Sequence, residues 1–405
     1  MISLLGICLL PLLAYAISHN RSAINLRTVL GAFAIQATIG GFVLYVPLGR
    51  DILSVLAAGV SNILEYSRDG IEFIFGGLTG DSIGFVFAIN VLPVIVFFSS
   101  LIAVLYYIGI MSWIIRIIGG FLQWVLRTSR PESMSAAANI FVGQSEAPLV
   151  VRPFIGQMTR SELFAIMVGG LASIAGSVMA GYASLGVDIK YLLAACFMAA
   201  PGGLMMAKII LPETEDAKDN LEDLEDAEDT NAYLNVFDAA ATGALTGLQM
   251  ALAVGAMLLA FIALIALLNG LVGWAGSLVG VEGLTIQLIL GYVFQPVAWA
   301  IGVPWHEANI AGSFIGQKLV LNEFVAYVSL AEVINDLTPR TQAIVTFALC
   351  GFANFSSIAI LLGGIGSLAP NRRDDIARLG IYALAAATLS NLMSASIAGF
   401  FLALA

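Results

Sequence analysis

The chain has 405 residues, of which 60% are hydrophobic and only 11% are charged, and its formal net charge is −10. This composition excludes a soluble domain with an ordinary polar surface and is typical of an integral membrane protein. The negative charge is concentrated in residues 213–229, which hold ten carboxylates and one lysine, so the remainder is close to neutral.

Eight apolar runs approach or exceed the roughly 20 residues that cross a bilayer as a helix. They cover residues 1–18, 28–48, 85–115, 161–185, 190–211, 243–271, 341–365 and 378–404. The predicted fold class is therefore an all-α polytopic membrane protein with about eight transmembrane helices. The first run ends like a signal-peptidase site, but no basic residue precedes its apolar part, and we interpret it as a retained helix.

The positions of the basic residues predict which loops are cytoplasmic. Arginines cluster at residues 21–27, 116–130, 152–160 and 372–378. Segment 131–160 therefore starts and ends on the cytoplasmic side, and we expect it to form a re-entrant hairpin. Residues 272–340 must also make an even number of crossings, which a second hairpin from the opposite face satisfies. Both termini are then predicted to be periplasmic.

The tip of the first hairpin carries the sequence GQSEAP at residues 143–148. A carboxamide and a carboxylate at membrane depth, Gln144 and Glu146, indicate a substrate or ion site because they are costly there. The second hairpin carries Glu323, which together with Asn354 and Ser357 can bind vicinal hydroxyls. The residues alone therefore predict a transporter of a small polar solute.

Short internal matches favour an inverted repeat, the plan of secondary transporters whose broken helices meet near the midplane. The matched pairs are residues 138–140 with 308–310, 154–157 with 314–317, and 170–173 with 351–354. The predicted architecture thus contains two opposed re-entrant hairpins, each followed by a long helix with a polar interruption.

Four segments resemble the concentrative nucleoside transporter family. They are SAAANIFVGQSEAPL at 135–149, GGLASIAG at 169–176, NEFVAY at 322–327 and CGFANFSSI at 350–358. The resemblance implies a homotrimeric symporter of the bacterial inner membrane that imports nucleosides with a cation, in an elevator-type mechanism. A transport domain would then move against a static trimerisation scaffold.

The resemblance also assigns roles to single residues. The nucleobase would face Gln144, Ser145, Glu146 and Val178. The ribose would be held by Glu323, Asn354 and Ser357, with Phe352 packing nearby. The Na+ site would fall on Asn139, Val142, Ser173 and Ile174, partly through backbone carbonyls, and such oxygen ligands suit a hard cation.

The expected domain organisation follows from the same resemblance. Residues 1–130 would be mainly scaffold and trimerisation helices, 131–211 the first transport repeat, 212–237 an acidic cytoplasmic loop, 238–280 a scaffold helix, and 281–405 the second transport repeat.

Several alternatives remain open at this point. Coupling to H+ would need a carboxylate such as Glu146 to titrate near neutral pH. Transport of another small polar solute is the second alternative. A channel would need a continuous polar path, and an intramembrane hydrolase would need a nucleophile beside a base, whereas the only histidines are His19 and His306. We therefore expect neither an enzyme nor a nucleic-acid partner.

Overall fold

The structure is a computed structural model that describes residues 2–79, 86–215, 233–278 and 280–404, and these residues form helices and no strand. The first half contains α1 (Ser3–Ala16), α2 (Leu26–Leu44), α3 (Pro47–Phe75), α4 (Phe87–Asn90), α5 (Leu92–Tyr107), α6 (Ile110–Leu126), α7 (Arg130–Ala138), α8 (Arg152–Ile155), α9 (Arg160–Ala172), α10 (Gly176–Ser184) and α11 (Ile189–Ile210). The second half contains α13 (Val236–Leu278), α14 (Ile286–Ala300), α15 (Trp305–Val320), α16 (Glu323–Val333), α17 (Pro339–Leu349), α18 (Phe355–Leu368) and α19 (Arg373–Phe401). Most of the predicted acidic loop lies outside the described residues.

Six helices in the described part of the chain are long and apolar enough to cross a membrane. They are Leu26–Leu44, Phe87–Tyr107, Arg160–Ser184, Ile189–Ile210, Val236–Leu278 and Pro370–Phe401. The other two of the eight predicted spans, residues 1–18 and 341–365, do not form single helices of membrane-spanning length. The first is α1, which has 14 residues. The run 341–365 is divided into α17 and α18 at residues 350–354, which include Gly351 and the helix-capping Asn354.

Polar side chains define where the helices around the two predicted tips begin. Asn322 caps α16 and Asn354 caps α18, and each side-chain oxygen accepts at 2.9 Å from the amide three residues later. Glu132 and Glu162 complete capping boxes at the starts of α7 and α9. Because a cap satisfies amides that a helix start leaves without partners, these residues fix the starts of the helices.

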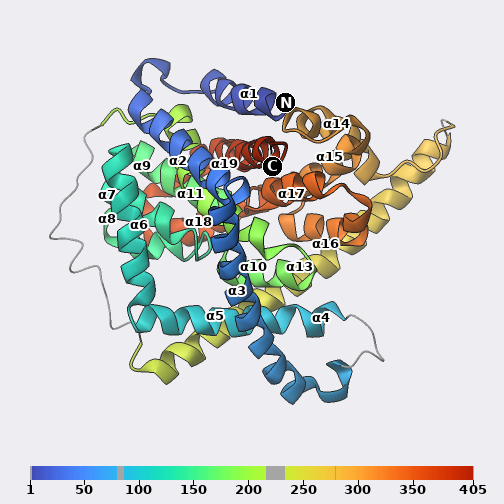
Figure 1. The fold of residues 1–405 in the computed structure, drawn as a ribbon, viewed down its shortest axis with the longest axis horizontal. Coiled ribbons are helices and arrows are strands. Elements are labelled where there is room, and N and C mark those ends of the chain that lie inside the picture. Colours follow the sequence, from blue (N-terminus) through green and yellow to red (C-terminus); the bar gives the residue numbers. More distant parts are fainter. Residues whose placement is uncertain (1, 80–85, 216–232, 279, 405) are drawn as a thin grey trace.

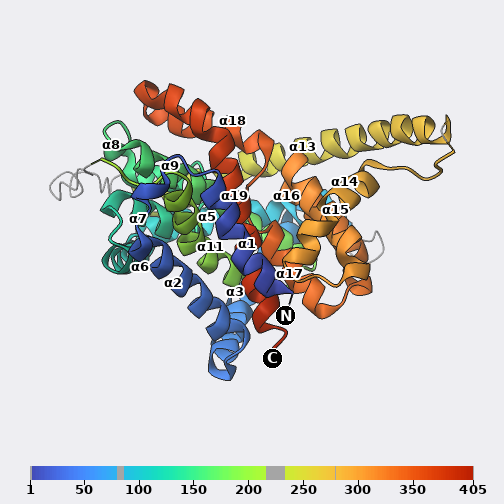
Figure 2. The same cartoon turned by 90° about the horizontal axis from the view of Figure 1, so that it is seen from above.

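Two sets of helix contacts bear most on the arrangement of the site. α5 and α13 lie side by side, whereas α1 and α2 pack against α11 and α19 in the centre of the molecule (Figure 1). The far end of α13 extends beyond the rest of the body (Figure 2). Gly247 permits the close approach of α13 to α5, since an added Cβ would lie 2.8 Å from the Cα of Val96. Small residues at such contacts are typical of helix packing in membranes.

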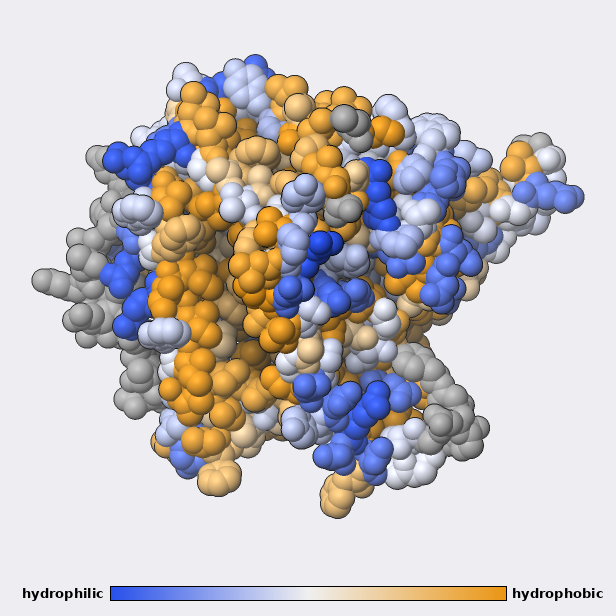
Figure 3. Space-filling view, in the orientation of Figure 1, coloured by the Kyte–Doolittle hydropathy of each residue, from blue (hydrophilic) through white to orange (hydrophobic). Residues whose placement is uncertain are grey.

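Large apolar side chains cover much of the surface, as expected for a protein surrounded by lipid. Leu259 on α13 is 78% exposed and Phe73 on α3 is 91% exposed. Figure 3 shows broad hydrophobic areas on one face of the molecule.

The apolar run 284–302 forms α14. The axes of α14 and of the following helix, α15, differ in direction by 115°.

Candidate functional site

Two long helices are interrupted, and their interruptions contact each other. The first break lies at residues 173–175, between α9 and α10, and the second at residues 350–354, between α17 and α18. The Phe352 amide donates a hydrogen bond to the Ser173 carbonyl at 3.1 Å, which joins the two breaks. Interrupted backbone that is enclosed by protein can offer its amides and carbonyls to a solute or an ion.

The first polar tip connects α7 to the short 3-10 helix Ala147–Val151 and packs on the helix that precedes the first break. Gly170 allows this approach, because an added Cβ would lie 3.0 Å from the Cβ of Gln144. The Gln144 side chain is buried, and its Nε2 donates to the Ser357 Oγ on α18 at 3.4 Å. Glu146 is half-buried beside it. The structure therefore brings this tip to the start of α18.

The second polar tip lies where α15 and α16 are joined by residues 321–322. Glu323 is only 5% exposed, and its two oxygens have different partners. Oε1 accepts from the Tyr182 hydroxyl on α10 at 3.0 Å, and Oε2 accepts from the Asn354 Nδ2 at 3.0 Å. Glu323 thus contacts the continuation of the first broken helix and the second break itself.

The other predicted substrate residues surround these two tips with different accessibility. Val178 is buried on α10, and Phe352 is half-buried within the second break. Ser145 is exposed, and it faces α18, where a Cβ at Gly364 would lie 3.8 Å from the Cβ of Ser145. The structure therefore places the predicted residues around the two tips and the two breaks.

The four predicted cation residues are all buried: Asn139, Val142, Ser173 and Ile174. Asn139 follows the last residue of α7, and its Nδ2 donates to the Ser135 carbonyl at 3.0 Å. Its Oδ1 is buried and has no hydrogen-bond partner among the described residues. The Ser173 hydroxyl donates to the Gly169 carbonyl at 2.9 Å, which leaves its acceptor lone pairs available.

These buried oxygens fit a small hard cation. A buried acceptor without a partner costs about 1–3 kcal/mol, which a bound cation would offset. Gly169 lies against Asn139, because an added Cβ would be 3.1 Å from the Asn139 Nδ2. The end of α7 and the turn of α9 before Ser173 are therefore adjacent. Oxygen ligands without nitrogen or sulfur are those that such a cation prefers.

Three further polar residues belong to this centre, and the sequence patterns did not predict them: Tyr182, Lys318 and Asn391. Tyr182 positions Glu323, and Asn391 on α19 donates to carbonyls at both breaks. A lone lysine in an apolar stretch was the available signal for Lys318. Tyr182 and Asn391 carry no such signal, because single tyrosines and asparagines occur often in helix bundles.

Two of the three internal sequence matches do not correspond in space. Residues 138–140 end α7, whereas residues 308–310 lie near the start of α15. Residues 154–157 include the end of the short helix α8 and the turn after it, whereas residues 314–317 lie within α15. The third match is at the two helix breaks and does correspond. Short matches in sequence rich in glycine and alanine arise by chance, and only the polar break carries structural information.

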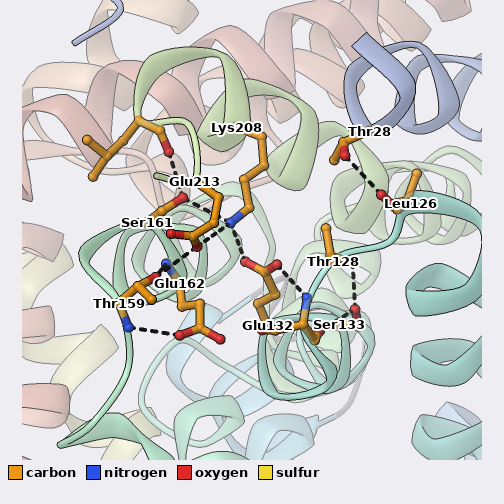
Figure 4. A network of polar contacts seen from close by, with 12 residues as sticks. Thr28, Leu126, Thr128, Glu132, Ser133, Thr159, Ser161, Glu162, Lys208 and Glu213 are labelled. Carbon is orange, nitrogen blue, oxygen red and sulfur yellow. Dashed lines mark hydrogen bonds and ion pairs between the residues drawn. The ribbon is translucent and has the colours of Figure 1, made fainter. Parts of the chain in front are cut away.

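A separate polar network lies at the start of α7, away from both tips (Figure 4). Lys208 on α11 forms an ion pair with Glu132 at 2.7 Å and a hydrogen bond with Ser161 at 2.9 Å. Glu213 approaches Lys208 at 3.6 Å and accepts from Thr159 at 2.8 Å. The network joins α7, α9 and α11, so we assign it a structural role in supporting the first tip.

Three family profiles match successive parts of the chain. They are "Na+ dependent nucleoside transporter N-terminus" at residues 5–78, "Nucleoside recognition" at residues 88–188 and "Na+ dependent nucleoside transporter C-terminus" at residues 191–399. Together the profiles extend over most of the chain and match both halves of the site.

Individual proteins agree with the profiles. The nucleoside permease NupC of Helicobacter pylori is 50% identical over 413 residues, covering 99% of this chain and 98% of that protein. The mouse (Mus musculus) sodium/nucleoside cotransporter 1 is 39% identical over 415 residues, covering 98% of this chain and 63% of that protein.

Solved structures share the fold over the whole chain. CNTnw in an inward-facing substrate-bound state is 56% identical, with a TM-score of 0.96 and coverage of 100% of this chain and 99% of that one. A CNTnw variant in an outward-facing state is 57% identical, with a TM-score of 0.97. The predicted all-helical membrane fold is confirmed, and the chain belongs to the Na+-dependent, concentrative nucleoside transporter family, whose members are transporters and not enzymes.

Proposed function

We propose that this chain is a symporter that imports nucleosides across the bacterial inner membrane with Na+ as the coupling ion. One observation supports this most directly: two polar tips from opposite halves of the chain converge on two helix breaks. Gln144 meets Ser357, and Glu323 meets Asn354. A site assembled from separate elements can bind a solute and open again when these elements move apart.

The first tip would bind the nucleobase. Gln144 offers two donors and an acceptor, and Glu146 offers acceptors, so the pair suits the amide and amino edges of a base. Ser145 adds a hydroxyl, and Val178 supplies an apolar surface from α10. The accessibility of Ser145 and Glu146 supports this assignment, because a base can reach them without disturbing packed side chains.

The second tip would bind the ribose. Glu323 accepts hydrogen bonds from neutral donors only, Tyr182 and Asn354. Lys318 acts on this carboxylate only from beyond ion-pair distance, so its oxygens can still accept from the vicinal hydroxyls of a sugar. Ser357 contributes a hydroxyl, and Phe352 supplies an apolar contact beside the sugar. Tyr182 would orient the carboxylate.

The Na+ site would consist of Asn139, Val142, Ser173 and Ile174. When bound, the ion supplies positive charge to oxygen atoms that the protein leaves without partners. Asn139 directly follows α7 and begins the first tip, so its position determines where Gln144 lies. Ser173 lies at the first break and accepts from Phe352 through its carbonyl. Ion and substrate therefore share the same supporting backbone, which is a physical basis for coupling.

The proposed movement is of the elevator type, in a homotrimer. We infer that α5 and α13 belong to the static scaffold and that the two tips and broken helices move. Because α1 and α2 pack against α11 and α19, we place them with the moving part, although residues 1–130 were expected to be mainly scaffold. Segments 131–160 and 305–333 would be the re-entrant hairpins, and both termini would be periplasmic.

Equilibrium binding to purified protein tests the substrate and the ion together. We expect uridine to bind in NaCl and to bind much more weakly in KCl. Ser173→Ala should require a higher Na+ concentration for the same uridine affinity, because one oxygen ligand is lost. Ser177→Ala, a buried serine on α10 outside the cation set, is the matched control.

The other outcomes of this experiment are equally informative. Uridine binding that ignores Na+ but strengthens at lower pH would replace the sodium site by proton coupling. Binding of neither uridine nor adenosine by folded protein would direct the search to another small polar solute.

A further inference from the structure

Lys318 on α15 is a lysine in the protein interior, only 4% exposed. Its Nζ donates to the Ala348 carbonyl at 2.8 Å and to the Asn391 Oδ1 at 2.7 Å. Among the described residues, no carboxylate lies within ion-pair distance of this amine. Glu323 is the carboxylate whose charge acts on this amine, but from beyond ion-pair distance. Burying an ammonium group without a directly paired carboxylate is costly, so the oxygens that it contacts must stabilise most of its charge.

Those oxygens belong to the end of a helix. Ala348 is in the last turn of α17, where carbonyl groups have no partner within the helix and form the negative end of its dipole. A cation is stabilised at that position. The second break begins directly afterwards, so the amine of Lys318 supports the backbone from which Phe352 and Asn354 project.

Asn391 extends this support to the first break. Its Nδ2 donates to the Cys350 carbonyl at 2.9 Å and to the Ala172 carbonyl at 2.7 Å. Ala172 is the last residue of α9, and Ser173 of the proposed Na+ site follows it. The Lys318 amine and the Asn391 carboxamide therefore donate hydrogen bonds to carbonyl groups at the ends of both broken helices.

Each of the two helix breaks would then have one cation beside its backbone oxygens. The first break has buried oxygens with free acceptor capacity that suit an exchangeable cation, and the second break has a lysine. We propose that Lys318 is a built-in cation, which does at the second break what the bound ion does at the first. A single exchangeable cation then suffices for each nucleoside. This inference rests on the proposed function.

Removing the amine tests the idea by chemical rescue. Lys318→Ala leaves room beside the Ala348 carbonyl and the Asn391 Oδ1 for a small cation. We expect uridine affinity at a fixed Na+ concentration to fall about tenfold or more. The Na+ dependence of binding should steepen from a Hill coefficient of about one to about two, because a second ion fills the space. Added methylammonium should restore binding and return the Hill coefficient to about one.

Two variants separate charge from volume and position. Lys318→Met fills the space without charge, so it should lose affinity and should not respond to methylammonium. Lys208→Ala removes another buried lysine, which pairs with Glu132 instead of helix carbonyls. It should lower the thermal midpoint without changing the Hill coefficient of Na+-dependent uridine binding.

The outcomes distinguish this inference from the proposed function. If wild-type protein binds no uridine in any salt, the proposed function fails, and the thermal midpoint of Lys318→Ala with and without methylammonium still tests the built-in cation. If wild type binds uridine and both Lys318 variants keep its affinity and Na+ dependence, the inference is overturned. If Lys318→Ala does not fold, a folded Lys318→Met with unchanged Na+ dependence and affinity overturns it as well.

Discussion

Glu323 is a buried carboxylate whose partners in the described structure are neutral, the Tyr182 hydroxyl and the Asn354 amide. Lys318 is the cation that acts on it, but from beyond ion-pair distance. A buried carboxylate without a directly paired cation is typical of a ligand-binding site in a membrane protein. Its neighbours hold it at the meeting point of α10, α16 and α18. The carboxylate is therefore the residue on which recognition of the sugar should depend most.

We predict that Glu323→Gln weakens uridine binding by about 10- to 100-fold, since a hydrogen bond to a charged group contributes about 1.5–3 kcal/mol. The free base uracil, which has no ribose, should lose little affinity. Titration calorimetry with both ligands measures this difference. Glu307→Gln is the control, because Glu307 accepts from Thr338 and Thr341 at the start of α15, away from the tip. Equal losses for uridine and uracil would mean that Glu323 is structural.

Single residues were predictable from sequence when their chemistry conflicted with their surroundings. Gln144, Glu146 and Glu323 are polar groups in apolar segments, and that conflict identified them. Tyr182 and Asn391 act through the geometry of helices far apart in the chain. Because neither residue type is unusual in a membrane helix, pattern alone could not find them.

At the scale of elements, the two breaks decide the shape of the site. Gly351 lies where they meet, and an added Cβ would be 2.7 Å from the Ala172 carbonyl and 2.8 Å from the Asn391 Nδ2. These atoms belong to the bridge between the two helices. Real Cβ atoms do not approach this closely, so a side chain here must separate the breaks.

Gly351→Ala should therefore lower the stability of the protein by about 1–3 kcal/mol, as overpacking does in a tight core. It should also weaken uridine binding, because both breaks shift. Gly363→Ala on α18 is the matched control: no atom lies within 4 Å of its added Cβ, and alanine is the better helix former. Thermal midpoints and uridine titrations compare the two. A Gly351→Ala protein as stable and as active as the control would contradict the described bridge.

The elements were predictable to different degrees. Hydropathy located the six helices of membrane-spanning length, because a long apolar run is sufficient to identify such a helix. The two polar breaks were predictable from the sequences GLAS at residues 170–173 and GFAN at residues 351–354. The exact residues at which the helices end beside the breaks were not predictable. The correspondence of the other short matches was wrong, because similarity of three or four residues says nothing about position within a helix.

At the scale of the whole molecule, the proposed movement divides the helices into a pair, α5 and α13, and a larger group that holds the site. The boundary between them includes a contact of α10 with α5, where a Cβ at Gly181 would lie 3.7 Å from the Ile95 Cδ1 and 3.4 Å from the Cγ1 of Val91, the residue before α5. Within the larger group, a Cβ at Gly40 on α2 would lie 2.7 Å from the Ile397 Cγ2 on α19. Hydropathy could not assign α1 and α2 to either group, because it carries no information on partners.

Disulfide crosslinks test the proposed division in a variant without native cysteines. A crosslink between Gly181→Cys and Val91→Cys joins the two groups, and it should abolish uridine uptake until a reductant is added. A crosslink between Gly40→Cys and Ile397→Cys lies within the moving group and should leave uptake intact. Uptake that survives the first crosslink, or is lost reversibly with the second, would refute the proposed boundary.

Uptake into liposomes tests the central claim most directly. Labelled uridine is offered with an inward Na+ gradient, with an inward H+ gradient and with neither, and Glu323→Gln, at a uridine concentration too low for it to bind, serves as the control. We predict accumulation above equilibrium with the Na+ gradient alone. Accumulation driven only by H+ would keep the nucleoside and remove the Na+ site, and no accumulation by folded wild-type protein under any gradient would contradict nucleoside symport itself.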